Sequence, residues 1–213
     1  MSKFKWIFAG ILLTMSMIFA GCGGDDEEGG GLPDDIGENN PNVIVALGDS
    51  ITQGFGDGGA PYPSRVANIT GLTVYNEGRG GERSGGGAGR VSGVLSRYKP
   101  AYLLILYGAN DAIAGADVES VIGNLRAIIG AAQANKTVPV LANLTPMYDG
   151  RALFNGKVDE YNPRIRDLAS ETGARFVNLS GEFGDERSLI QADGLHPTDS
   201  GNQVIAFAFS DRI

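Results

Sequence analysis

Residues 102–111 read Tyr-Leu-Leu-Ile-Leu-Tyr-Gly-Ala-Asn-Asp, an unbroken apolar run that ends in small and polar residues. A run without polar alternation is typical of a strand covered on both faces. The pattern also occurs earlier, where the apolar residues 43–47 lead into Gly48-Asp49-Ser50. Two strands of this kind predict a parallel sheet that lies between layers of helices.

Further strands and helices alternate along the rest of the chain. The other predicted strands are residues 73–76, 138–143 and 175–178, and the predicted helices are residues 118–132, 158–170 and 199–209. Asp117 is placed to cap the first helix, and Pro163 predicts a break or kink in the second. The order predicts an α/β fold with a five-stranded, mostly parallel sheet and helices on both faces. Ligands of such sheets bind at the carboxyl ends of the strands.

The first 21 residues have the layout of a secretory signal peptide. Lys3 and Lys5 precede an apolar run over residues 6–20, and Cys22, the only cysteine, follows directly after Gly21. This layout resembles a bacterial lipoprotein signal, which implies that Cys22 is lipidated and that the exported protein is anchored to a membrane, periplasmic or at the cell surface. The alternatives are an uncleaved anchor helix and an ordinary signal peptide with an incidental cysteine.

Residues 22–41 are predicted to form a tether. They contain seven acidic residues, no basic residue and many glycines, a composition that stays extended and solvated. Residues 42–213 then form a single domain. This domain has no basic patch, so we expect no nucleic-acid partner. We also expect a monomer. A single histidine excludes a multi-histidine metal site.

Four segments that follow predicted strands or precede the last helix carry candidate functional groups. They are Gly48-Asp49-Ser50-Ile51-Thr52, Asn76-Glu77-Gly78-Arg79-Gly80-Gly81, Gly108-Ala109-Asn110-Asp111 and Asp193-Gly194-Leu195-His196-Pro197. Each has an ordinary structural explanation when it is considered alone, such as a helix cap, a surface loop or a turn. Together they supply the parts of an acyl-transfer site.

A serine hydroxyl becomes a good nucleophile when a neighbouring base accepts its proton. His196 is the only histidine that can serve Ser50, and Asp193 on the same short loop can orient the imidazole. The oxyanion of the intermediate needs hydrogen-bond donors. The Ser50 backbone N–H, a glycine N–H of the second segment and the Asn110 amide are candidates.

At these four segments the chain resembles the SGNH hydrolases, also called the GDSL esterase/lipase family. The resemblance extends from about Val43 to Phe209 and places the oxyanion glycine of the second block at Gly81, with Gly78 as the fallback. It implies a three-layer flavodoxin-like fold. It also implies hydrolysis of esters or thioesters with catalytic residues Ser50, Asp193 and His196, and without a cofactor or metal.

Two other functions that glycines and serines can indicate, a nucleotide site and an α/β-hydrolase site, are not supported by the sequence. The glycines between Gly78 and Gly89 have no G-x-G-x-x-G register, and no Gly-Lys-Ser/Thr follows them, which argues against a nucleotide site. The chain also lacks the G-x-S-x-G elbow of α/β-hydrolases.

The substrate is less well defined by the sequence. The absence of a long apolar insertion favours short-chain esters, such as acetyl groups on carbohydrates. A lysophospholipase or thioesterase is the alternative activity, and a non-catalytic glycan- or lipid-binding lipoprotein is the alternative class. The residues predicted to line the site are Tyr62, Tyr107, Met147, Tyr148 and Phe183.

Overall fold

The sheet at the centre of the molecule is wholly parallel. The computed structural model describes residues 35–56 and 58–213, so the predicted signal peptide, Cys22 and most of the predicted tether lie outside the described residues. The strands lie in the order β2-β1-β3-β4-β5. Their bounds are β1 Asn40–Gly48, β2 Thr73–Gly78, β3 Pro100–Leu106, β4 Val138–Ala142 and β5 Arg175–Val177.

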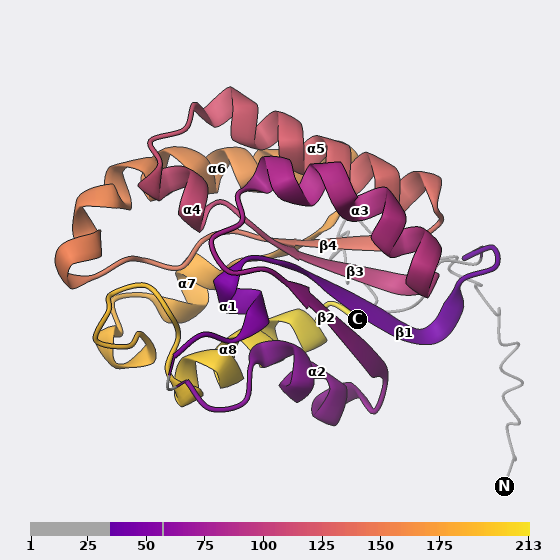
Figure 1. The fold of residues 1–213 in the computed structure, drawn as a ribbon, viewed down its shortest axis with the longest axis horizontal. Coiled ribbons are helices and arrows are strands. Elements are labelled where there is room, and N and C mark those ends of the chain that lie inside the picture. Colours follow the sequence, from indigo (N-terminus) through magenta and orange to yellow (C-terminus); the bar gives the residue numbers. More distant parts are fainter. Residues whose placement is uncertain (1–34, 57) are drawn as a thin grey trace, which may run out of the picture.

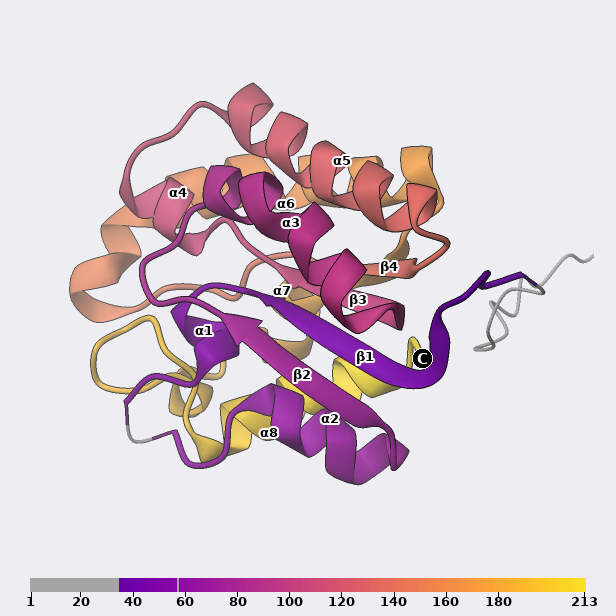
Figure 2. The same ribbon diagram turned by 45° about the vertical axis from the view of Figure 1, so that its right-hand side comes forward.

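Helices cover both faces of this sheet (Figures 1 and 2). One face carries α2 (Tyr62–Thr70) and α8 (Asp199–Ser210), and the other carries α3 (Ser84–Tyr98), α5 (Val118–Ala134) and α6 (Asn155–Thr172). The shorter helices are α1 (Ser50–Gln53), α4 (Ala109–Ile113) and α7 (Leu179–Phe183), with 3-10 turns at Asp149–Phe154 and Arg187–Leu189. The predicted α/β fold class is confirmed.

The connections from β1 and β3 leave the sheet on opposite sides. The chain after β1 enters α1 and then α2 on one face, whereas the chain after β3 enters α4 and then α5 on the other. In an open parallel sheet this divergence leaves a crevice at the carboxyl ends of the two strands. Ser50 follows β1 and Asn110 follows β3, so the fold brings two of the four predicted segments to this point.

The central strands form the core. Every residue of β3 is buried, and β1 is buried from Val43 onward. Complete burial of each such Leu, Ile or Val side chain contributes about 1.5–3 kcal/mol before the loss of conformational entropy is counted. Among the described residues, no helix is both long and apolar enough to cross a membrane.

Two of the predictions about helix ends have different outcomes. The Asp117 side chain accepts a hydrogen bond from the Ser120 N–H at 3.1 Å, as expected of an N-cap. Of the predicted break or kink at Pro163, the break is wrong, because α6 continues through this residue. Pro163 and Asp159, whose carbonyl loses its partner, are both exposed, and water can satisfy that carbonyl while the buried face of the helix holds the turn together.

Helix α3 contains five glycines and was not predicted. Its first turn is stabilised by a residue outside the helix. The Asp111 carboxylate accepts hydrogen bonds from the Ser84 N–H at 2.9 Å and the Ser84 hydroxyl at 2.8 Å. All of these groups are buried. A carboxylate at a helix N-terminus satisfies a free N–H and favours the helix dipole. Asp111 therefore ties the start of α3 to α4.

Candidate active site

Ser50 is the first residue of α1, directly after the buried strand β1. The Asp49 side chain caps this short helix and accepts a hydrogen bond from the Ile51 N–H at 2.9 Å. Ser50 Oγ lies 2.9 Å from His196 Nε2, and both residues are 7% exposed. The hydroxyl is thus within proton-transfer distance of the only histidine in the chain.

His196 lies on a loop that is folded tightly back on itself. The Gln191 N–H donates to the His196 carbonyl at 2.8 Å, and Ile190 forms an antiparallel bridge with Pro197. Asp193 Oδ1 accepts the backbone N–H groups of Leu195 and His196, each at 3.0 Å. Asp193 Oδ2 contacts His196 Nδ1. One carboxylate therefore fixes both the loop and the imidazole.

The environment keeps the Asp193 carboxyl ionised. Partial burial on its own would raise the pKa of Asp193, but the hydrogen bonds from the His196 ring and from the backbone N–H groups of Leu195 and His196 outweigh it and lower that pKa. A carboxylate at Nδ1 holds the proton on that nitrogen and leaves Nε2 free to accept one. This is the tautomer that a base for Ser50 needs.

The two candidate oxyanion glycines lie in different environments. Residues 79–82 form a turn in which the Glu82 N–H donates to the Arg79 carbonyl at 3.1 Å. Gly81 takes a φ of +75°, as the third position of a type II turn requires. The Gly78 N–H is already bonded to Asn76 Oδ1 at 2.9 Å, and a Cβ on Gly78 would lie 2.1 Å from the Gln53 nitrogen. Gly78 is a close-packing glycine, and its N–H has a partner.

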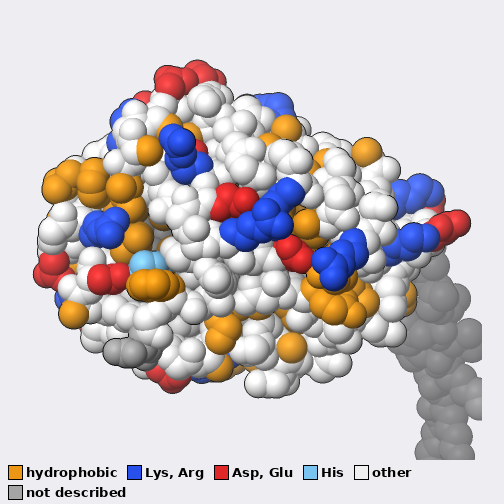
Figure 3. Space-filling model, in the orientation of Figure 1, with side chains coloured by type: hydrophobic (Ala, Val, Ile, Leu, Met, Phe, Trp, Pro, Cys, Tyr) orange, Lys and Arg blue, Asp and Glu red, His pale blue; other side chains and the backbone are white. Residues whose placement is uncertain are grey.

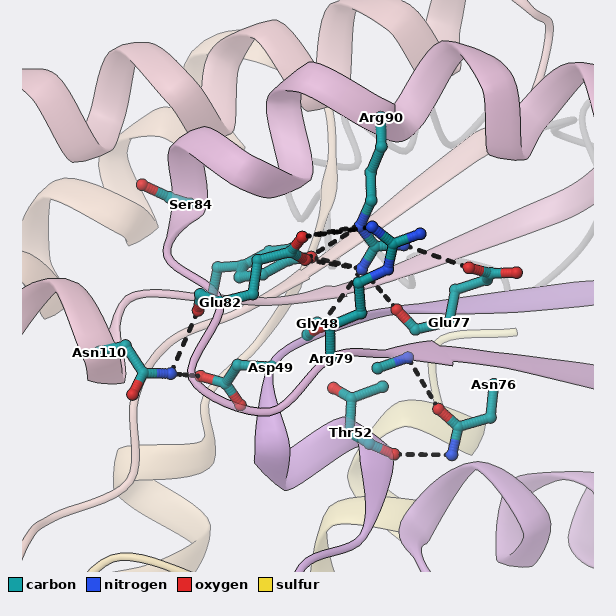
Figure 4. Close-up of polar contacts among 12 residues, drawn as sticks. Gly48, Asp49, Thr52, Asn76, Glu77, Arg79, Glu82, Ser84, Arg90 and Asn110 are labelled. Carbon is teal, nitrogen blue, oxygen red and sulfur yellow. Dashed lines mark hydrogen bonds and ion pairs between the residues drawn. The ribbon is translucent and has the colours of Figure 1, made fainter.

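The Asn110 amide points toward the turn that contains Gly81 and toward Asp49 (Figure 4). Asn110 Nδ2 lies 3.1 Å from the Glu82 carbonyl oxygen and 3.2 Å from Asp49 Oδ2. Burial raises the pKa of Asp49 to about 7, although the hydrogen bond from the Ile51 N–H opposes the rise. Both Asn110 contacts are at the long end of the hydrogen-bond range.

Phe55 lies against the catalytic candidates and was not singled out from the sequence. Its ring is tilted over the His196 imidazole with 4.6 Å between centroids, and the residue is 59% exposed. Figure 3 shows the histidine at the surface with hydrophobic side chains beside it. A lone aromatic between Gly54 and Gly56, five residues after Ser50, is the sequence feature that points to it.

Most of the residues predicted to line the site belong to the core. The side chains of Tyr62, Tyr107, Met147 and Phe183 have at most 1% exposure, so the prediction that they contact substrate is wrong for these four. Tyr62, for example, stacks on Phe209 and shares a hydrogen bond with Thr52. Tyr148 is partly exposed. Proximity to a strand end does not say which way a side chain points.

The described part of the chain contains no cluster of metal-ligating side chains. Across residues 35–56 and 58–213, no three His, Cys, Asp or Glu side chains lie close enough together to hold a metal ion. The polar groups that the structure brings together at the carboxyl ends of the strands are a serine, an imidazole, a carboxylate and an amide. This set suits proton transfer and acyl transfer.

A family model matches most of the described domain. The model of the GDSL-like Lipase/Acylhydrolase family matches residues 46–204. Thioesterase 1/protease 1/lysophospholipase L1 of Escherichia coli K12 is 25% identical over 174 residues, which cover 78% of this chain and 80% of that protein. A Bacillus subtilis protein named lipoprotein YqeF is 24% identical, and the alignment covers 94% of this chain and 96% of the relative.

Solved structures share the fold. An acetylxylan esterase, Axe2 of Geobacillus stearothermophilus, superimposes with a TM-score of 0.68 at 20% sequence identity. The superposition covers 82% of this chain and 94% of that one. At this identity the likeness concerns the α/β architecture and the order of its elements.

Proposed function

The chain belongs to the GDSL-like lipase/acylhydrolase family and is a carboxylic ester hydrolase, and from that premise we propose that it is an exported serine esterase acting through Ser50, His196 and Asp193. The observation that carries the proposal is the 2.9 Å separation of Ser50 Oγ and His196 Nε2, with Asp193 on the other ring nitrogen. Membership of a hydrolase family disfavours the non-catalytic binding protein.

The reaction proceeds in two acyl transfers. His196 Nε2 accepts the Ser50 proton as Oγ attacks the ester carbonyl carbon, and Asp193 stabilises the imidazolium. The tetrahedral intermediate collapses, the C–O bond to the alcohol breaks, and His196 returns its proton to the leaving oxygen. Water then attacks the acyl-serine with His196 again as the base. The carboxylic acid leaves, and Ser50 regains its proton.

The oxyanion is held by donors from three segments. In the proposed arrangement these are the backbone N–H groups of Ser50 and Gly81 and the side-chain amide of Asn110. The Gly81 N–H makes no hydrogen bond to another described residue, whereas the Gly78 N–H is bonded to Asn76, which favours Gly81. One N–H of the Asn110 amide contacts the Asp49 carboxyl at 3.2 Å, which is long for a hydrogen bond and therefore weak. In the proposed reaction this N–H leaves Asp49 and donates to the oxyanion as negative charge develops there.

We propose short-chain esters, acetyl esters of carbohydrates among them, as the substrates. Four of the side chains predicted to line the site, Tyr62, Tyr107, Met147 and Phe183, are buried in the core instead and offer no surface to a long acyl chain. The apolar side chain in contact with His196 is the exposed Phe55, which offers one face to a small acyl or alcohol group. The competing proposal is a lysophospholipase or thioesterase, an activity named for the Escherichia coli relative.

An acyl-chain series tests the substrate class. A pocket that buries each added methylene would stabilise the bound acyl chain by about 0.8 kcal/mol, or about fourfold in kcat/KM, per methylene. We expect instead that kcat/KM for 4-nitrophenyl esters is highest from acetyl to butyryl and falls by octanoyl. A steady rise from acetyl to octanoyl would contradict the short-chain assignment and favour the lysophospholipase or thioesterase.

We also propose that Cys22 is lipidated and anchors the domain at a membrane. The support is the basic, apolar and small-residue order of residues 1–21 and the name lipoprotein given to the Bacillus subtilis relative. The acidic residues 22–41 then form a solvated spacer between the lipid and residues 42–213.

Cys22→Ser tests the anchor directly. In a bacterial host we expect the wild-type chain in the membrane fraction and in the detergent phase of a Triton X-114 extraction. The thioether-linked lipid cannot form on serine, so the variant should no longer incorporate a radiolabelled fatty acid supplied to the cells, while its folded domain keeps the same kcat. Wild-type protein found only in the aqueous phase would argue for an ordinary signal peptide.

A further inference from the structure

Arg90 lies in the second turn of α3, and its side chain extends toward Glu82 of the turn formed by residues 79–82 and is only 11% exposed. Its guanidinium donates to both carboxylate oxygens of Glu82, at distances from 2.7 to 3.1 Å. It also donates to the Glu77 carbonyl at 2.6 Å and lies 3.2 Å from the Glu77 carboxylate. One partly buried cation therefore joins the end of β2 to the turn that contains Gly81 (Figure 4).

The side chain and the backbone of Glu82 contact different residues. Its carboxylate is bound by Arg90 and by the Tyr107 hydroxyl, which donates at 2.5 Å, whereas its backbone carbonyl accepts the Asn110 amide at 3.1 Å. Partial burial would raise the pKa of Glu82, but the hydrogen bonds from Arg90 and Tyr107 lower it, so the carboxyl stays ionised. The side chain that Arg90 fixes thus belongs to the residue whose carbonyl contacts Asn110.

Tyr107 completes the cluster from the end of β3. Its hydroxyl also accepts a hydrogen bond from Arg90 Nη2 at 2.8 Å. The ring lies against the α3 backbone at Gly87, where a Cβ would be 2.5 Å from the ring. The carboxyl end of β1 is near as well, since Arg90 Nη2 lies 3.5 Å from the Gly48 carbonyl oxygen. The cluster of Glu77, Glu82, Arg90 and Tyr107 therefore touches the ends of three strands.

We propose that Arg90 is a positioning residue for the oxyanion donors. Through Glu82, it holds the 79–82 turn and the Asn110 amide at the spacing that the tetrahedral intermediate needs. The inference rests on the proposed function, because it assigns Arg90 its role through Gly81 and Asn110.

The chemistry of arginine explains why this position is not a simple ion pair. The planar guanidinium binds Glu82 through Nε and Nη2 together, so it fixes the direction of the carboxylate as well as its distance. Lysine offers a single point of attachment. A donor displaced by about 1 Å can cost about 100-fold in rate while leaving ground-state binding almost unchanged. The effect should therefore appear in kcat rather than in KM.

Arg90→Met tests the role with little change in side-chain volume. We expect kcat for 4-nitrophenyl acetate to fall about 10- to 100-fold, with KM within about threefold of wild type. Arg126→Met is the matched control, because Arg126 on α5 forms an exposed ion pair with Glu171 on α6, and the substitution should leave both constants unchanged. An unchanged kcat in folded Arg90→Met would overturn the proposal.

A double-mutant cycle separates positioning from general support of the fold. Asn110→Ala should lower kcat by about 100- to 1,000-fold if it removes one oxyanion bond. If Arg90 acts through the same donors, the double variant should be at least about tenfold more active than the product of the two single effects predicts. A double variant that matches this product within threefold would contradict the positioning role.

Tyr107→Phe keeps the test decisive if Arg90→Met does not fold. It removes only the hydroxyl that bridges Arg90 and Glu82 and should lower kcat about threefold to tenfold, again with KM unchanged and with the same non-additivity toward Asn110→Ala. Full activity in Tyr107→Phe would overturn the proposal.

A normal kcat in Asn110→Ala would remove the oxyanion assignment itself, which is a failure of the proposed function. A normal kcat in Arg90→Met alone removes only the inference.

Discussion

Ser50→Ala should abolish turnover of 4-nitrophenyl acetate, with kcat lowered by at least about 10⁴-fold. The substitution removes the only atom that can form the acyl-enzyme and leaves His196 Nε2 without its 2.9 Å partner. The oxyanion donors and substrate binding remain, and on their own they accelerate hydrolysis only about 10³- to 10⁴-fold over water. Initial rates and labelling by a fluorophosphonate probe, which reacts with an activated serine hydroxyl, measure the loss.

The fold should survive this change. The side chain becomes smaller by one oxygen, and the Asp49 cap of α1 bonds to Ile51 rather than to Ser50. Ser92→Ala is the matched control, because Ser92 lies on the exposed side of α3 and undergoes the same chemical change. Normal hydrolysis by folded Ser50→Ala, or probe labelling at another serine, would remove Ser50 from the nucleophile role.

The architecture was predictable because the strands are buried on both faces. A continuous apolar run of five residues such as 102–106 is short for a helix and typical of a strand covered on both faces, and the carboxyl ends of such strands meet at one edge of the sheet. Burial of β3 over its whole length confirms this reading. The single histidine also left one candidate base for Ser50, and the structure brings the two side chains together.

Helix α3 and the role of Arg90 could not be predicted from sequence patterns, because both depend on contacts between residues far apart in the chain. The start of α3 is held by Asp111, 27 residues after Ser84, so its glycines gave no sign of a helix. Arg90 was overlooked for the same reason, because Glu77, Glu82 and Tyr107 meet it only in the folded chain. The failed lining predictions have a different cause, since an aromatic after a strand can turn inward as Tyr107 does. The catalytic roles of the site residues stay predictions.

Asp193→Asn should lower kcat by about 1,000-fold with little change in KM. The amide oxygen can still accept the N–H groups of Leu195 and His196, so the loop should keep its shape. The amide nitrogen, however, would donate to His196 Nδ1 and place the ring proton on Nε2. A protonated Nε2 cannot accept the Ser50 proton. Because the Asp193 side chain is 37% exposed, water can partly replace the carboxylate, and we expect a loss below the 10⁴-fold of a fully enclosed triad.

The pH dependence of stability distinguishes this electrostatic effect from a damaged loop. A carboxyl with a lowered pKa stabilises the folded state above its unfolded pKa, and this contribution disappears as the pH falls through the lower, folded value. The Tm of Asp193→Asn should therefore lie below that of wild type at pH 7. The two Tm values should begin to converge below about pH 4 and meet once the pH is below the folded pKa of Asp193. Asp159→Asn on the exposed side of α6 is the control and should follow wild type at every pH. A Tm difference that stays constant with pH would show that the substitution disrupts the loop, and unchanged kcat would mean that Asp193 does not orient His196.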